Sequence, residues 1–469
     1  MTPPPSQVSA TSVAQAVWSY TPRSLTDIQS LTAAIQNNNP GAVPDYSDLQ
    51  YVPAPYFAGQ VSLTQVAAFI DNVVRNYSMV NPIANFIVNS PYNLWTTNFV
   101  SSLAANPYLS VTSLNMLLSN ANMTANYAQF LLYYLAQNYY YNKWIYTVTA
   151  NAPSSITFSA NATLSTNVLI AQNITIASGV TVTCGTTTCF FVAQSFNNYG
   201  TITAIGAPGG VTATSSETNY GGTGGGGIVA IAITAVLGTL NVSGGNGGTS
   251  TINSLTNSGG NGANGVFYIV SGVTAPIGGT GGASGYLGAA GINSGGGGGS
   301  AAGTYGGKGG NATANSFSSP NAMVTYILQG LSDWWLINVL GKAPSSTTPL
   351  AYMYGSGGGA GGGGAGGNVP GGGGGGGGEV VVYGYDIVSG TINAAGGAGG
   401  NAYNAGSTLP AGGGGGGGGG LVFIFYGATS GSVTANVAGG TGGVGTTSPS
   451  NGLAGANGTA YIAAVTVNG

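Results

Sequence analysis

Apolar side chains recur every three or four positions through much of residues 1–145, which is the spacing of one face of an α-helix. Ser24 and Ser62 each begin a capping-box sequence ahead of such a stripe. The longest stripe runs from Thr124 to Tyr140, and prolines separate the segments. The pattern predicts a helical region over 1–145, which we interpret as an attachment or assembly domain.

From Ile145 onward the hydrophobic period changes from 3.6 to 2, and small or turn residues separate short apolar runs. Evenly spaced short strands are typical of a β-solenoid or a β-sandwich, so we expect a short-strand β domain over 146–200. The expected strands cover residues 156–158, 168–170, 174–176, 180–182 and 190–192.

Glycine divides the chain, because five of its 88 glycines lie in residues 1–200 and the other 83 lie in 201–469. In this second part a unit recurs: an apolar β-forming run, a Gly-Thr or Gly-Ser turn, a second short strand, and a Gly-Gly-x-Gly-Gly element. We therefore expect a glycine-rich β-repeat domain over 201–469. The apolar runs begin at Ile228, Glu379 and Leu421, the turns at Gly238, Gly390 and Gly431, and the glycine elements at Gly244, Gly396 and Gly439.

Ordering a glycine is entropically costly, so an ordered glycine run must use the missing Cβ. One interpretation is sharp solenoid corners with positive φ and close backbone approach. Another is packed polyglycine II-like helices with three residues per turn, for which the runs 371–378 and 412–420 are long enough. The alternative is a flexible linker, although linkers do not usually alternate with strands as apolar as 421–425.

An apolar insertion, 321–343, interrupts the glycine-rich part and contains the adjacent Trp334 and Trp335. Ser332 is placed to cap a short helix that ends at Gly341. We expect the insertion to pack against the glycine-rich region. Alternatively, the two tryptophans form a contact patch for a host surface or another subunit.

Charge is nearly absent: Lys and Arg number 5, Asp and Glu number 8, and there is no histidine. The chain is not disordered in composition, since 43% of it is hydrophobic and 27 residues are tyrosine. The lack of histidine excludes a Ser-His-Asp triad and a His-ligated metal site. Five basic residues are too few for phosphate-driven nucleic-acid binding. Little charge also means little repulsion between copies, which favours self-association.

We find no catalytic constellation and expect no cofactor. Asp45 and Asp48 are the only close pair of carboxylates, and we interpret them as a turn, with a weak Ca²⁺ site as the alternative. No glycine tract has the Gly-Lys-Ser/Thr ending of a phosphate loop. Cys184 and Cys189 predict either one local disulfide that staples a turn or two buried thiols.

The sequence also bears on location. Its first 30 residues have no basic region followed by a long apolar run, and no stretch reaches the roughly 18 apolar residues that span a bilayer, so we expect neither a Sec signal nor a membrane span. Asn-x-Ser/Thr sequons would be glycosylation sites if the protein faces the outside of the cell. These sequons are at Asn76, Asn122, Asn161, Asn173, Asn241, Asn311 and Asn457.

Two features resemble known proteins. The strand, Gly-Thr-Ile-Asn and Gly-Gly-x-Gly-Gly repeat, over roughly 150–469, resembles the glycine-rich β-structured parts of viral and phage fibre, spike and adhesin proteins. The segment 16–26, Ala-Val-Trp-Ser-Tyr-Thr-Pro-Arg-Ser-Leu-Thr, is similar to a short motif of phage tail and fibre proteins. The low charge with abundant Tyr, Asn, Ser and Thr resembles surface proteins of hyperthermophilic archaea and their viruses. The resemblance implies a structural protein of a virion surface or a filament, and it implies no site residues.

Our first hypothesis is therefore a non-enzymatic, α+β multidomain protein: a helical N-terminal region followed by an all-β glycine-rich region. It would form a virion fibre, spike or filament by self-association, with other virion proteins and a host cell surface or its glycans as partners. The second hypothesis is a cellular surface filament or adhesin of a thermophilic archaeon. The third is a glycan-degrading enzyme carried on a spike.

Overall fold

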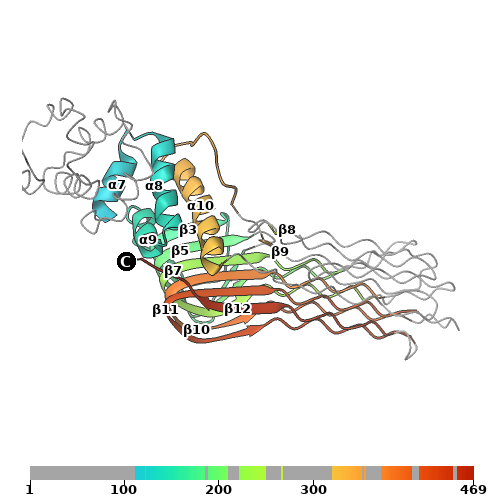
Figure 1. Cartoon of the computed structure of the whole chain (residues 1–469). Coiled ribbons are helices and arrows are strands. Elements are labelled where there is room, and N and C mark those ends of the chain that lie inside the picture. The colour runs from blue at the N-terminus through green and yellow to red at the C-terminus, as the bar shows by residue number, and fades with distance from the viewer. Residues whose placement is uncertain are drawn as a thin grey trace, which may run out of the picture. The chain divides into compact units, whose positions relative to one another are not determined.

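The computed structural model of the chain shows a small helical unit and a larger, mostly β unit (Figure 1). The first unit comprises 1–138 with 332–347, and the second comprises 139–331 with 348–469. The predictions for Ser24, Ser62, Asp45 and Asp48 lie outside the described residues. The described residues are 111–121, 123–184, 188–209, 221–249, 266–267, 319–350, 353–354, 371–403, 411–446 and 451–468.

The helical unit contains α7 (Val111–Ser119) and α8 (Ala125–Gln137). Thr124 is the N-cap of α8, since its hydroxyl accepts a hydrogen bond from the backbone N–H of Tyr127 at 3.4 Å. Both helices fall inside the region that we expected to be helical. Residues 1–110 are outside the described part, so the helical N-terminal region as a whole stays a prediction.

The apolar insertion forms a single helix, α10 (Pro320–Asn338). The expectation that Ser332 caps a short helix is wrong, because Ser332 is buried in the middle of α10. Gly341, three residues past the end of the helix, has a φ of 65°, the left-handed conformation in which glycine often follows a helix, and the N–H of Lys342 bonds back to the carbonyl of Leu336 at 2.8 Å. Trp335 is buried and Trp334 is half-buried, so only Trp334 retains side-chain exposure for a contact patch.

The ammonium group of Lys342 holds the end of another helix in the same unit. It donates 2.7 Å hydrogen bonds to the carbonyls of Leu118, Asn120 and Met123, which close or follow the last turn of α7. A cation at this position satisfies carbonyls that have no partner inside the helix and complements its dipole. The charge therefore has a structural role.

The β unit begins with another helix, α9 (Tyr141–Thr149). One face of α9 is fully buried and consists of Tyr141, Trp144, Ile145 and Val148. We expected strands to begin at Ile145, but this apolar helical face continues past it, so the helix does too. The helix packs on the central strands of a sheet. The first strand starts at Ser155.

The sheet has ten strands, all of its pairs are parallel, and it bends until it is nearly closed into a barrel. Its main order is β1-β3-β5-β7-β10-β11-β12, and β2-β4-β6 is a branch that joins β7. The strands are β1 (Ser155–Phe158), β2 (Ala162–Thr163), β3 (Val168–Ile176), β4 (Thr181–Thr183), β5 (Cys189–Asn198), β6 (Thr201–Thr203), β7 (Gly227–Asn241), β10 (Glu379–Asn393), β11 (Leu421–Asn436) and β12 (Thr459–Ala464). A separate antiparallel pair joins β8 (Val266–Phe267) to β9 (Met353–Tyr354).

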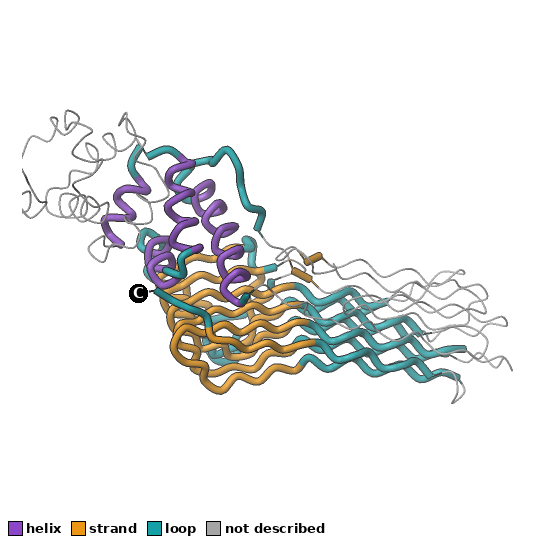
Figure 2. Tube along the Cα trace, in the orientation of Figure 1, coloured by secondary structure: helices purple, strands orange, loops and turns teal. Residues whose placement is uncertain are grey.

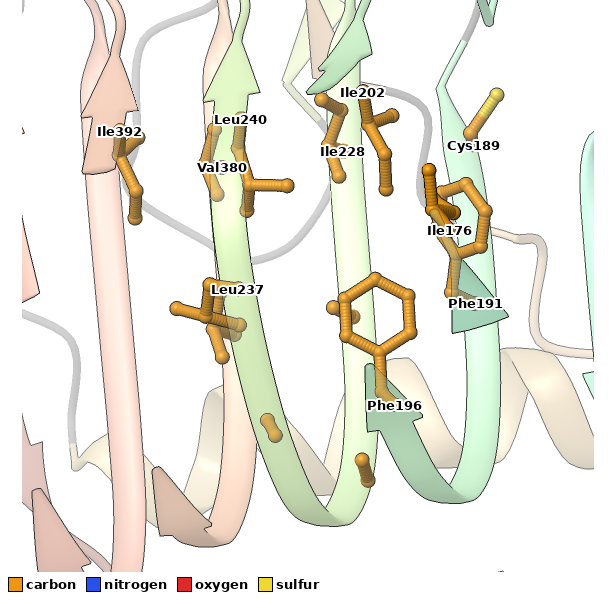
Figure 3. Packing of buried hydrophobic residues seen from close by; sticks show 14 of the residues in the cluster. Ile176, Cys189, Phe191, Phe196, Ile202, Ile228, Leu237, Leu240, Val380 and Ile392 are labelled. Atoms are coloured by element: carbon orange, nitrogen blue, oxygen red, sulfur yellow. The ribbon is translucent and has the colours of Figure 1, made fainter. Parts of the chain in front are cut away.

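The long strands β7, β10 and β11 lie side by side in register. We call each of these strands, together with the segments that flank it, one coil. The first half of β7 pairs with β5 and its second half pairs with β6, so one strand serves both branches of the sheet. A cluster of buried apolar side chains fills the inside of the bend, with Phe191, Phe196 and Leu237 among its members (Figure 3). The residue at the bend is Gly238, which has a φ of 53°. Glycine is favoured here because a Cβ would overlap the carbonyl oxygen of Asn198.

The register corrects one detail of the repeat. Gly390 pairs with Val433, so Gly431 is not the equivalent turn residue of the third copy. An irregularity after Gly384 places one extra residue in β11, which shifts the register by one position. Beyond it the copies agree again, because Asn393 pairs with Asn436 and with Asn241.

Candidate functional site: a hydrogen-bonded glycine lattice

The candidate functional region begins where the long strands end. Each of β7, β10 and β11 is preceded by one glycine-rich tract and followed by another, one more tract follows β6, and one more precedes β12. The tracts of neighbouring coils run on beside one another (Figure 2). We call the eight tracts together the glycine lattice. The entering tracts are 221–226, 371–378, 411–420 and 451–458, and the leaving tracts are 204–209, 242–249, 394–402 and 437–446.

Neighbouring leaving tracts are parallel and bond at every third residue. Gly244 and Gly247 donate to the carbonyls of Ala395 and Ala398 at 2.9 and 2.7 Å. Tracts 394–402 and 437–446 repeat this spacing, with donors at Gly396, Gly399 and Ala402. The entering tracts do the same: Gly371, Gly374 and Gly377 donate to the carbonyls of Gly412, Gly415 and Gly418. A period of three means that each tract has three residues per turn.

Entering and leaving tracts are antiparallel and bond to one another in rows. One row runs from Gly245 to Gly375, Gly397, Gly417 and Gly440, and each of the last four donates to the carbonyl of the residue before it. The four distances are 2.8, 2.7, 2.9 and 2.7 Å. The row joins residues that are almost 200 positions apart into one chain of hydrogen bonds, and such chains strengthen cooperatively.

The close approach of the tracts explains why glycine is required. A Cβ on Gly375 would overlap the carbonyl oxygen of Thr223, and one on Gly417 would overlap that of Gly375. The place of the side chain is occupied by a neighbouring backbone acceptor. In these tracts glycine is thus required for packing, not for positive φ.

The sequence of each tract reflects its position in the lattice. Tracts 371–378 and 412–420 contain only glycine and are buried along their whole length. The leaving tracts after β7, β10 and β11 repeat Gly-Gly-x, and x is the residue on the outer face. In tract 451–458, at the edge, only every third residue, Gly452, Gly455 and Gly458, is glycine. The x residues are Ser243, Asn246, Thr249, Ala395, Ala398, Asn401, Ala438, Thr441 and Val444.

Several x side chains accept hydrogen bonds from backbone groups of the outer face. Asn246 Oδ1 accepts from the N–H of Ala398 at 2.9 Å, and Asn401 Oδ1 accepts from that of Val444 at 2.8 Å. Thr249 Oγ1 accepts from the N–H of Asn401 at 3.2 Å. Within the described residues, the N–H groups of Ala398, Asn401 and Val444 have no neighbouring tract on the outer face to bond to, so side-chain oxygens accept from them in place of a backbone carbonyl.

A row of asparagines marks the junction between strands and lattice. Asn436 Nδ2 donates to Asn393 Oδ1 at 3.1 Å, and Asn393 Nδ2 donates to Asn241 Oδ1 at 3.2 Å. Each Oδ1 also accepts from the backbone N–H two residues ahead. This ladder was not expected from the sequence, although a Thr-x-Asn sequence that recurs at the end of all three long strands is a signal for it.

The predicted disulfide and glycosylation sites stay predictions. Cys184 and Cys189 are free thiols in the structure, both are buried, and Cys189 Sγ donates to the carbonyl of Cys184 at 3.8 Å. The hydrogen bond between the two thiols, more than burial, raises the pKa of Cys184. Among the sequons, Asn161, Asn173 and Asn457 are exposed and Asn241 is in the ladder, whereas Asn76, Asn122 and Asn311 lie outside the described residues.

The ionisable groups of the described residues form no reactive cluster. No group of three or more Cys, Asp and Glu residues in that part could hold a metal ion. Glu379 is buried at the start of β10, its Oε2 has no partner among the described residues, and burial raises its pKa well above the usual value. Its register partners are Gly227 and Leu421, so the repeat does not require a carboxylate here.

Comparison with other proteins gives no family. Nothing matched the chain among family models, curated proteins or solved structures. Within the described residues no helix is long and apolar enough to cross a membrane.

Proposed function

We propose that this protein is a non-enzymatic structural component of a virion surface, where it forms a fibre, spike or filament by self-association. The observation that supports this best is the row of hydrogen bonds through Gly375, Gly397, Gly417 and Gly440. We interpret the tracts as polyglycine II-like helices, and the coils between them as a β-solenoid. A lattice bonded in two directions resists bending, which suits a projecting part.

Uncharged composition supports the same role. No Asp, Glu, Lys or Arg occurs after Asp386, so the coils of β11 and β12 carry no acidic or basic side chain that would make two copies repel each other near neutral pH. Asn, Thr and Ser side chains on the outer face keep it hydrated. We propose host adhesion as an additional role, carried out at the cell surface or on its glycans.

The same features fit a surface filament or adhesin of a thermophilic archaeal cell. Location decides between the two proposals. Antibodies against residues 371–446 should label purified virions, and cryo-electron microscopy of those virions should resolve the coils on their surface. Label on cell-surface filaments, with none on virions, would support the cellular alternative.

Self-association is a separate test. Light scattering of the purified protein at micromolar concentration should give a mass well above the 45.8 kDa of one chain. A stable monomer that forms no filaments in electron micrographs would contradict the proposal. An activity that degrades host glycans would favour the enzyme hypothesis instead.

A further inference from the structure

The edge of the glycine lattice raises a question about assembly. Inside the lattice, each leaving tract donates a hydrogen bond from every third N–H to the next leaving tract. Gly396, Gly399 and Ala402 do this toward the carbonyls of Ala438, Thr441 and Val444. In the last leaving tract the equivalent donors are Gly439, Gly442 and Gly445, and no further leaving tract follows among the described residues.

Two asparagine side chains occupy the place of the missing tract. Asn457 Oδ1 accepts from the N–H of Gly439 at 3.1 Å, and Asn451 Oδ1 accepts from that of Gly445 at 2.9 Å. Both asparagines belong to the last entering tract, which is bonded to the same leaving tract through its backbone. Gly452, Gly455 and Gly458 donate to the carbonyls of Gly443, Gly440 and Val437. A side-chain amide thus replaces a backbone carbonyl at each end of the row.

The opposite edge has the complementary chemistry. The x carbonyls of each leaving tract accept from the tract before it, as those of Ser243 and Asn246 do from Gly206 and Gly209. In the first leaving tract of the described residues, Ile205 and Pro208 occupy these acceptor positions, and no described residue donates to their carbonyls. A second copy of this chain would therefore present acceptors at its first edge that match the donors of the last edge. Such a contact joins head to tail and does not close, so it would continue without limit.

We propose that Asn451 and Asn457 terminate the glycine lattice: they satisfy the donors to which a second copy's first tract would bind, and so restrict self-association to other surfaces. This inference extends the proposed function, because it specifies which surface does not join the copies. Terminal repeats of other stacked proteins need a comparable cap for solubility. Edge strands of β-sheets present the same hazard and are blocked in similar ways.

The test compares three variants with the natural chain. The double variant Asn451→Ala and Asn457→Ala removes both acceptor oxygens. Asn451→Asp with Asn457→Asp keeps an acceptor of the same shape, and Thr441→Ala changes the outer face of the same tract. Amide hydrogen exchange over 437–446 and sedimentation velocity between 1 and about 100 μM give the two readouts, chosen to span weak association.

The alanine pair should exchange about fivefold faster at Gly439 and Gly445, the factor expected for about 1 kcal/mol of hydrogen bonding. Its mass should rise with concentration beyond that of the natural chain, while the aspartate pair and Thr441→Ala keep the natural mass. An alanine pair with an unchanged mass distribution overturns the proposal, whether or not exchange accelerates. Because the readout is the change from the natural mass, it does not depend on whether the natural chain is itself an oligomer.

A gain-of-function variant provides a second measurement. Ala454 lies between the two asparagines and, by the same register, opposite Gly442. Ala454→Asn should add a third acceptor and slow exchange at Gly442 severalfold, without change of mass. Unchanged exchange at Gly442 would show that the row does not work as proposed, even if the alanine pair fails to fold.

Discussion

The β half and the glycine half of the same coils stack in the same order but are held together by different means. In the β half, side chains such as Phe191 and Ile228 fill the inside of the bend, and burial of apolar surface stabilises it. In the glycine half there are almost no side chains to bury, and the backbone is bonded to neighbours on several sides. One half should therefore fail when side chains are removed, and the other when they are added.

The largest effect should come from the β half. Phe191→Ala removes a buried ring that packs against Phe196, with ring centroids 5.6 Å apart. We expect a loss of about 3 to 5 kcal/mol in the free energy of unfolding, as for other buried Phe-to-Ala changes. Denaturant titration measures it, with Phe130→Ala, an exposed ring of the helical unit, as the control. A loss as small as that of the control would contradict the idea of a core held by burial.

The matching change in the glycine half adds a methyl group. Gly375→Ala should destabilise by about 1 to 3 kcal/mol, because the new Cβ meets the carbonyl of Thr223 and forces the tracts apart. Without that clash, Gly→Ala would stabilise by restricting the unfolded chain, so the sign of the change is diagnostic. Thr441→Ala on the outer face should change stability by less than about 0.5 kcal/mol. A stabilising Gly375→Ala would refute the packed lattice.

These two halves also differ in how well the sequence predicts them. The short strands expected at 168–170, 174–176 and 190–192 were predictable because a period of two is a local pattern. The structure confirms strands there, but joins the first two in Val168–Ile176 and extends the third to Cys189–Asn198. The pairing of the glycine tracts was not, since Gly375 bonds to Gly245 and accepts from Gly397, and only the fold brings these together. The sequence shows that 412–420 contains only glycine, but it does not show that an all-glycine tract is fully buried.

Other misses have local causes. Ser332 has the residue type of an N-cap, yet the segments before and after it, 323–331 and 334–337, are both mostly apolar and helical, so the helix continues through it. The turn expected at Gly431 is misplaced because the Gly-Ser-Val-Thr sequence there resembles the turns of the other copies, whereas the register, with one extra residue in β11, pairs Gly390 with Val433. The asparagine ladder was missed because its three members become neighbours only after the coils stack.

The boundary between the halves provides a pH test. Burial raises the pKa of Glu379, so the folded state binds a proton that the unfolded state has released above about pH 4.3. Stability should therefore fall as the pH rises through this region. Glu379→Gln should remove that fall and be more stable by roughly 1 to 2 kcal/mol at neutral pH. Thermal unfolding between pH 3 and 8 measures both curves, which we expect to converge at the acid end.

The outcome that would contradict this is a natural chain whose stability rises with pH over the same range. Glu379→Leu, which copies Leu421 of the neighbouring coil, should behave as the glutamine variant does. Asp386→Asn is the control, since this carboxylate accepts a hydrogen bond from Thr429 in an exposed position.

The smallest effect should come from the asparagine ladder, where both kinds of stabilisation meet. Asn393→Ala removes the central member, which donates to Asn241, accepts from Asn436 and caps the N–H of Ala395. We expect a loss of about 0.5 to 1.5 kcal/mol, because the ladder is only half-buried and water replaces part of each bond. Amide exchange at Ala395 should accelerate, whereas Thr391→Ala, two residues earlier on the exposed side, should leave it unchanged. Faster amide exchange that extended along the row from Gly397 to Gly417 would show instead that the ladder holds the whole lattice in register, and not only Ala395 beside it.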